Sequence, residues 1–107
     1  MYATIRRYTL KDAKGGKDTI AGLKQRIERN YLPKVQEVQG FHGYYVVNTN
    51  GRELTSISIF ETAAGTKEST RLAAEFVRAD PIKDQLSSPE VIEGELIVSR
   101  EIAVGAH

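Results

Sequence analysis

Hydrophobic residues recur along the chain with two periods, one typical of strands and one typical of helices. Residues 2–10 are rich in Tyr, Thr and Ile, which predicts a β-strand, and the polar residues 11–16 predict a loop after it. Between residues 19 and 38 apolar side chains return every three or four positions, on one face of a predicted helix. They are Ile20, Leu23, Ile27, Tyr31, Val35 and Val38. Because Pro33 lacks an N–H, we expect a kink or break near Tyr31.

Two further β-type runs, residues 41–48 and 53–61, are joined by Thr49-Asn50-Gly51-Arg52. Asn50-Gly51 is the preferred pair for a two-residue type I′ turn, which predicts a hairpin with Thr49 opposite Arg52. That register pairs Val47 with Leu54, Tyr45 with Ser56, Gly43 with Ser58 and Phe41 with Phe60, all on one face. The other face then carries His42, Tyr44, Val46, Thr55, Ile57 and Ile59.

A second helix is predicted after the hairpin, capped at Thr62 or Thr66 and ended by Pro81. Its apolar stripe is Leu72, Ala73, Phe76 and Val77. Residues 91–100 predict a last strand. The order β-α-β-β-α-β indicates an α+β, ferredoxin-like domain spanning residues 1–107, with a four-stranded antiparallel sheet and both helices on one face.

Both faces of the predicted hairpin are apolar, although the helices can cover only one of them. The face with Tyr44, Val46, Ile57 and Ile59 is the more apolar one. A second copy of the chain is the simplest cover for the face left bare, so we expect a homodimer.

Composition removes several classes of function. The 107 residues include 15 basic and 14 acidic side chains, so we expect no broad basic surface for nucleic acid. The absence of cysteine excludes disulfides and thiolate metal sites, and scattered carboxylates with two histidines predict no metal site. The longest apolar runs are strand-sized, and Arg6 and Arg7 interrupt any secretory signal, so we expect a cytoplasmic protein that does not enter a membrane.

Several segments carry a family resemblance. Ala-Thr-Ile-Arg-Arg-Tyr (3–8), Gly-Phe-His-Gly-Tyr (40–44), Ser-Ile-Ser-Ile-Phe-Glu (56–61) and the helix after them resemble the antibiotic biosynthesis monooxygenase superfamily, over about residues 2–99. The resemblance implies a dimeric α+β barrel with a cleft between each sheet and its helices. Characterised relatives include cofactor-independent oxygenases of polycyclic phenols and quinols, and haem-degrading monooxygenases.

The haem-degrading branch uses an Asn on the first strand, a Trp ending the third strand and a His on the second helix. Here these positions hold Arg6, Phe60 and no histidine. We therefore expect neither haem nor another tightly bound cofactor.

Matching the family's cleft positions to Arg6 and Phe60 assigns one set of side chains to the helix-facing side of the sheet. The set is Thr4, Arg6, Tyr8, Tyr45, Ser56, Ser58 and Phe60. A buried Arg with two serines is unusual in a packing core, and with Tyr31 it indicates a ligand pocket. We predict Arg6, Tyr45 and Ser58 as catalytic residues, with substrate contacts from Thr4, Tyr31, Ser56 and Phe60.

A purely structural interpretation of this set stays open. Arg6 could reach water at the sheet edge or pair with Glu93 or Glu95, while the serines hydrogen-bond locally. His42 titrates near neutral pH and could accept a phenolic proton, but its register puts it on the opposite face; the other histidine is the terminal His107.

Three functions follow from these patterns. The first is a cofactor-independent monooxygenase that acts on a small phenol- or quinol-like aromatic. The second is a non-catalytic dimeric module that binds a small molecule or stabilises a partner. The third is RNA binding, because RNA-recognition domains share this element order, but residues 54–60 lack their basic and glycine-aromatic signature.

Overall fold

The computed structural model describes residues 1–11 and 16–101; most of the predicted loop 11–16, and His107, lie outside the described residues. The elements, in chain order, are β1 Tyr2–Thr9, α1 Gly16–Arg26, the π-helical turn η1 Ile27–Tyr31, α2 Leu32–Val35, β2 Phe41–Thr49, β3 Glu53–Phe60, α3 Ala63–Ala79, the 3₁₀ turn η2 Pro81–Asp84 and β4 Glu90–Glu95.

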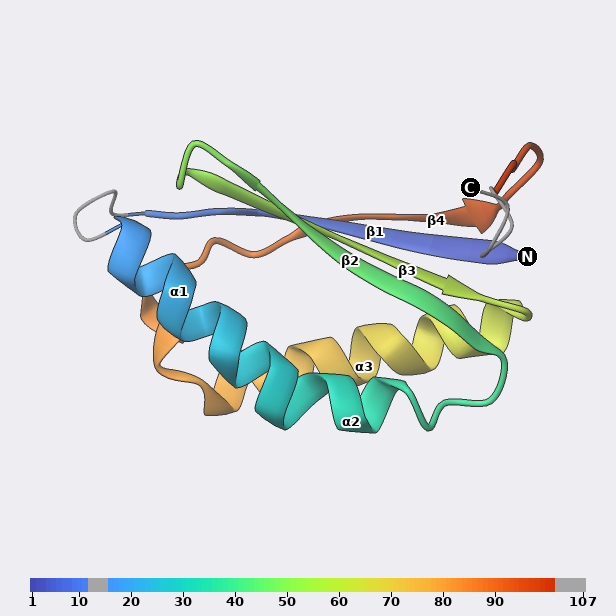
Figure 1. Cartoon of the computed structure of the whole chain (residues 1–107), viewed down its shortest axis with the longest axis horizontal. Helices are drawn as coiled ribbons and strands as arrows, with labels where there is room; N and C mark the ends of the chain where they lie inside the picture. The colour runs from blue at the N-terminus through green and yellow to red at the C-terminus, as the bar shows by residue number, and fades with distance from the viewer. Residues whose placement is uncertain (12–15, 102–107) are drawn as a thin grey trace, which may run out of the picture.

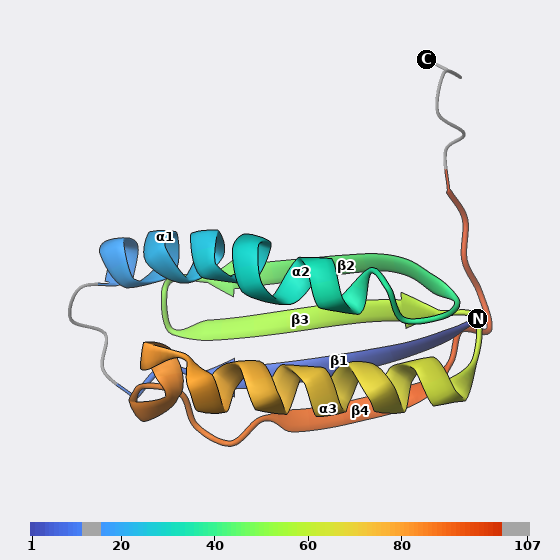
Figure 2. The same ribbon diagram turned by 90° about the horizontal axis from the view of Figure 1, so that it is seen from below.

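The four strands form one antiparallel sheet in the order β2-β3-β1-β4. Both rows of helix lie on the same face of this sheet (Figure 1), with α1 and α2 over β2 and β3, and α3 over β1 and β4 (Figure 2). The predicted ferredoxin-like α+β fold is confirmed. In the centre of the sheet, Arg6 of β1 lies opposite Ser56 of β3, and Thr4 lies opposite Ser58.

The β2–β3 hairpin has the predicted turn residues but a different register. Asn50 and Gly51 have φ values of 54° and 68°, as a type I′ turn requires. Arg52, however, is an extra loop residue: its N–H bonds the Thr49 carbonyl at 3.0 Å, while its own carbonyl accepts from the Leu10 N–H at 2.8 Å. Because the Arg52 carbonyl bonds the end of β1, strand pairing starts with Thr49 opposite Glu53.

This one-residue difference exchanges the two faces of β2. The predicted pairs of Tyr45 with Ser56 and of Gly43 with Ser58 are wrong, because Val46 lies opposite Ser56 and Tyr44 lies opposite Ser58. The predicted pair of Val47 with Leu54 is wrong for the same reason, since Leu54 opposes Asn48. Tyr44 and Val46 therefore face the helices, and Tyr45 and Val47 lie on the outer face with Ile57 and Ile59.

A bulge at the start of β2 restores the predicted pair of Phe41 with Phe60. The extra residue there is His42, which is exposed and has its Nε2 3.3 Å from Glu61 Oε1. His42 is thus a surface residue at the strand end.

The first helix is distorted just before Pro33, at Ile27–Tyr31, as predicted from the sequence. The Leu32 N–H bonds the Ile27 carbonyl five residues back, so the turn before Pro33 is wider than an α-turn. A wider turn relieves the clash that the proline ring would otherwise make with the preceding turn. The distortion leaves Tyr31 pointing inward and only 2% exposed.

The ends of α3 and β4 have local causes. Thr62 Oγ1 accepts from the Gly65 N–H at 3.2 Å and caps α3, which ends at Ala79 before Pro81, as predicted. The prediction that β4 reaches residue 100 is wrong. Pairing stops at Glu95, which lies opposite Tyr2 at the end of β1, and one further hydrogen bond follows from the Leu96 N–H to the Met1 carbonyl at 2.8 Å. None of the described helices is long and apolar enough to cross a membrane.

Two hydrophobic clusters join the helices to the sheet. One contains Leu10, Leu23, Leu54, Ile82 and Leu86, and the other contains Tyr31, Val35, Phe60 and Ala73. Ile27 and Phe76 pack against both clusters. Arg6 is buried next to them, in the middle of β1.

Candidate ligand-binding site

Arg6 is the most unusual side chain of the interior, since it is 2% exposed. Its Nη1 donates to Thr70 Oγ1 of α3 at 3.2 Å, and its Nη2 donates to the Tyr31 hydroxyl and to Ser58 Oγ, each at 3.3 Å. All three acceptors are neutral hydroxyls. They hold the guanidinium in place without compensating its charge.

Among the described residues, no carboxylate forms an ion pair with Arg6. Glu93 of β4 is linked to Arg6 through Thr70, because its Oε1 lies 3.0 Å from Thr70 Oγ1, which accepts from Arg6. The same Glu93 oxygen lies 3.4 Å from Thr4 Oγ1. The structural interpretation in which Arg6 pairs directly with Glu93 or Glu95 is therefore not the observed arrangement. Arg6 does not reach water either.

A cavity of about 40 Å³ opens beside Arg6, between the sheet and the helices. Its polar lining consists of Arg6, Tyr8, Tyr31, Tyr44 and Ser56. The remaining lining is aliphatic or aromatic, with Leu23, Ile27 and Phe76 among its residues. This combination of a mostly apolar wall and a few convergent polar groups is typical of a small-molecule site.

Two larger surface grooves meet this region. On the β2 side, a groove of about 320 Å³ shares Leu23, Ile27, Tyr44, Val46 and Leu54 with the cavity. On the β4 side, a groove of about 550 Å³ touches Arg6 and Tyr8 and carries two further cations, Arg78 and Lys83. The groove on the β2 side of the cavity is thus mainly apolar, and the groove on the β4 side is cationic.

The three tyrosines of the cavity are weak acids in this environment. Burial is the main effect, and it raises the pKa of Tyr8, Tyr31 and Tyr44 above that of an ordinary phenol, while the Arg6 charge lowers each pKa by less. All three are neutral at physiological pH. None of them can act there as a base.

The structure brings together some of the predicted site residues. Arg6, Tyr31 and Ser56 line the cavity, and Ser58, which is fully buried, accepts a hydrogen bond from Arg6. The assignment of Tyr45 to the cleft is wrong: this side chain is 56% exposed on the outer face, because the hairpin register differs by one residue.

Thr4 and Phe60 are fully buried on the helix-facing side, as predicted, but they do not line the cavity. The Phe60 ring packs edge-on against Phe41 at 5.7 Å between centroids. Phe60 is therefore a packing residue, and Thr4 reaches the site only through Glu93.

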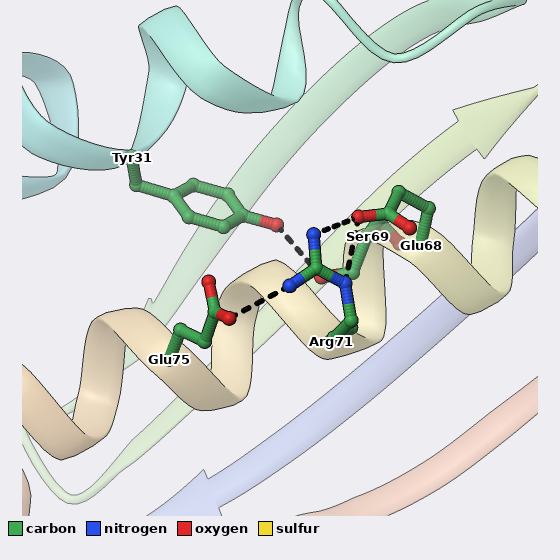
Figure 3. A network of polar contacts seen from close by, with 5 residues as sticks. All are labelled: Tyr31, Glu68, Ser69, Arg71 and Glu75. Carbon is green, nitrogen blue, oxygen red and sulfur yellow. Dashed lines mark hydrogen bonds and ion pairs between the residues drawn. The ribbon is translucent and has the colours of Figure 1, made fainter.

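Two residues of the site did not emerge from the sequence. Tyr44 occupies the place predicted for Tyr45, because the extra loop residue Arg52 shifts the register of β2 by one residue. Thr70 holds Arg6 from α3, and no sequence pattern distinguishes it from other helical threonines. Figure 3 shows how α3 also orients Tyr31, whose hydroxyl donates to the Ser69 carbonyl at 3.3 Å, while Arg71 pairs with Glu68 and Glu75 on the same helix.

Within residues 1–11 and 16–101, no group of three or more His, Cys, Asp or Glu side chains could hold a metal ion. The helix α3 contains no histidine, and His42 is on the surface, far along the sheet from Arg6. The described residues thus offer no axial ligand for haem iron from this helix.

No family model matches the sequence, and no curated protein matches it. Solved structures do match its fold. A dimeric ferredoxin-like protein from an uncultured marine organism is 6% identical and has a TM-score of 0.73, and the match covers 94% of this chain and 98% of that one.

Two characterised proteins show how widely the chemistry of this fold varies. SnoaB, a cofactor-independent oxygenase from Streptomyces nogalater, is 7% identical with a TM-score of 0.63, over 92% of this chain and 94% of that one. MhuD, a haem-degrader from Mycobacterium tuberculosis with two haems bound in its active site, is 13% identical with a TM-score of 0.64, over 94% of this chain and 100% of that one.

Structures that bear the name of antibiotic biosynthesis monooxygenases, from Nitrosomonas europaea and Bordetella bronchiseptica, also match. The resemblance to that superfamily is therefore confirmed at the level of the fold. At these identities the likeness fixes the architecture and leaves the chemistry to the site.

Proposed function

We propose that this protein is a cofactor-independent monooxygenase that acts on a small phenol- or quinol-like aromatic in the cavity between sheet and helices. The supporting observation is a buried Arg6 that forms no ion pair among the described residues and lies at the wall of an apolar cavity. A cation there stabilises the negative charge that develops on a substrate oxygen. The fold is also that of SnoaB, a cofactor-independent oxygenase.

An anthrone illustrates the reaction. Loss of one proton gives an electron-rich carbanion, which reacts with dioxygen at the ring CH₂ carbon to form a peroxide anion. This anion takes up one proton and becomes a hydroperoxide. The hydroperoxide loses water and leaves a carbonyl group. One oxygen atom enters the product and the other leaves as water, and the substrate supplies all four electrons, so the reaction needs no external reductant.

The residues have separate roles in this proposal. Arg6 and Ser56 contact the substrate oxygen and act as the catalytic groups, and Tyr31, Ser58 and Thr70 position the guanidinium. Tyr44 replaces Tyr45 as the β2 aromatic at the cavity.

The size of the cavity limits where the rings can bind. A volume of about 40 Å³ holds about three water molecules. A polycyclic substrate must therefore extend into the β2-side groove of about 320 Å³, past the side chains that line both spaces.

Oxygen uptake with anthrones, quinols and flavonols, measured with a chelator present, tests the proposal. We expect uptake above the buffer rate with at least one of them. Arg6→Met should lower turnover more than apparent binding, because the lost contact is strongest in the transition state. No uptake with any compound, from folded wild-type protein, would refute an enzymatic role.

One observation favours the alternative of a non-catalytic dimeric module that binds a small molecule. The titratable groups at the cavity are one arginine and three tyrosines with raised pKa values, so no side chain there can take a proton at neutral pH. Saturable binding of an aromatic ligand without oxygen uptake would support this module.

A further inference from the structure

Two buried polar atoms, on residues that line the cavity, have no hydrogen-bond partner among the described residues. They are Nε of Arg6 and Oγ of Ser56. Both residues line the cavity, and they lie opposite each other on adjacent strands. Because buried polar groups are nearly always paired, two orphaned groups at one wall indicate a partner that is not part of the chain.

The charges around Arg6 show what kind of partner is missing. The other polar side chains that line the cavity or accept a hydrogen bond from Arg6 are neutral: Tyr8 from β1, Tyr31 from η1, Tyr44 from β2, Ser56 and Ser58 from β3, and Thr70 from α3. Glu93 from β4 accepts from the same Thr70 hydroxyl that accepts from Arg6, and it forms no ion pair with Arg6. A buried cation with no direct counter-ion favours an anionic ligand.

We propose that the cavity binds its aromatic ligand as an anion, with the ionised oxygen on Arg6 Nε and Ser56 Oγ, and that the ligand loses its proton to solvent instead of to a protein base. This inference rests on the proposed function for the location of the site, but it does not require turnover. It also accounts for the missing base, because a substrate that is already ionised when it binds needs none.

The ring system then lies on the apolar side of Arg6. Five residues separate the cavity from the β2-side groove, and four of them are apolar: Leu23, Ile27, Val46 and Leu54. The fifth, Tyr44, supplies an aromatic face for stacking. A flat monoanion with its oxygen at one end matches this arrangement, whereas a dianion would place its second charge against these apolar walls.

The direction in which the pKa of a bound phenol changes distinguishes two modes of binding, as the tyrosines of the cavity show. Burial raises their pKa values, including that of Tyr31, whose hydroxyl accepts from Arg6 Nη2 at 3.3 Å, so this shared hydrogen bond does not offset the effect of burial. A phenolic ligand whose oxygen accepts from both Arg6 Nε and Ser56 Oγ, two donors with no other partner among the described residues, should show a lowered pKa. A ligand held only by apolar contacts should show a raised one.

The experiment uses 2-naphthol, whose neutral and ionised forms differ in absorption and fluorescence. Bound to the wild-type protein, it should ionise at least one pH unit below the free compound, which corresponds to about tenfold tighter binding of naphtholate than of naphthol. In Arg6→Met this shift should disappear. Arg52→Met, which removes an exposed arginine from the hairpin loop, should retain it.

A second measurement needs only the wild-type protein, in case Arg6→Met does not fold. At a pH where 2-naphthol is ionised, it should bind at least about tenfold more tightly than its neutral analogue 2-methoxynaphthalene. Equal or weaker binding of naphtholate, no binding of naphtholate, or an unchanged or raised pKa for bound naphthol would each overturn the inference.

The outcomes separate this inference from the proposed function. Preferential naphtholate binding without oxygen uptake by any compound of the panel would support an anion site and refute the monooxygenase. Oxygen uptake together with an unshifted naphthol pKa would support the enzyme and overturn the anion site.

Discussion

At the scale of single residues, Arg6 is placed for ligand binding at a cost to folding. Its guanidinium has left water, and its remaining contacts are hydrogen bonds of 3.2–3.3 Å to neutral hydroxyls. Desolvation of an unpaired charge costs several kcal/mol, of which neutral hydrogen bonds recover only part. A residue of this kind is expected at a position where ligand binding, and not the stability of the fold, determines which side chain is present.

We therefore predict that Arg6→Met stabilises the ligand-free protein by about 1–2 kcal/mol, because an unbranched apolar side chain of similar length replaces a buried cation. Urea unfolding of both proteins, followed by circular dichroism, measures the difference. A loss of stability of 3 kcal/mol or more would instead show that Arg6 is a structural residue held by its hydroxyl partners.

At the scale of elements, the site depends on how closely α3 approaches β3. Gly65, in the first turn of α3, lies so near Phe60 that a Cβ atom there would be 2.8 Å from the Phe60 Cβ and ring atoms. Phe60 is fully buried and cannot move aside. This contact fixes the start of the helix that carries Ser69 and Thr70 to Tyr31 and Arg6.

Gly65→Ala should accordingly destabilise the protein by about 1–3 kcal/mol, through overpacking against Phe60. Gly94→Ala is the matched control, because a Cβ at Gly94 in β4 meets nothing within 4 Å. We expect the control to change stability by no more than about 0.5 kcal/mol. Thermal unfolding of both variants measures these effects, and equal effects would contradict the packing argument.

At the scale of the whole molecule, the outer face of the sheet lacks a cover in the single chain. Its apolar residues include Tyr45, which is 56% exposed, and Ile92, which is 63% exposed, together with Val47, Ile57 and Ile59. Towards one end of the strands the same face carries the Arg7–Glu90 ion pair at 2.9 Å. An apolar centre bordered by charges is typical of a protein interface.

We infer that two copies of the chain pair through this outer face. Ile57→Glu and Tyr45→Glu should each yield monomers or unfolded chains, since the new charge would be buried without a partner. Ala21→Glu, on the exposed side of α1, should leave the dimer intact. Sedimentation velocity at micromolar concentration distinguishes these outcomes, and a monomeric wild-type protein would contradict the interface.

The sequence by itself determined the order of elements and the place of the helix distortion, because these depend on local causes: apolar periodicity, the Thr62 cap, Pro33 and Pro81. It also brought Arg6, Tyr31, Ser56 and Ser58 to one side of the sheet. Only the tertiary structure decided between Tyr44 and Tyr45, because the Arg52 carbonyl bonds Leu10 of β1, a residue distant in sequence, and this contact moves the hairpin register by one position. That Arg6 has no ion-pair partner among the described residues likewise depended on how α3 and β4 place Thr70 between Arg6 and Glu93.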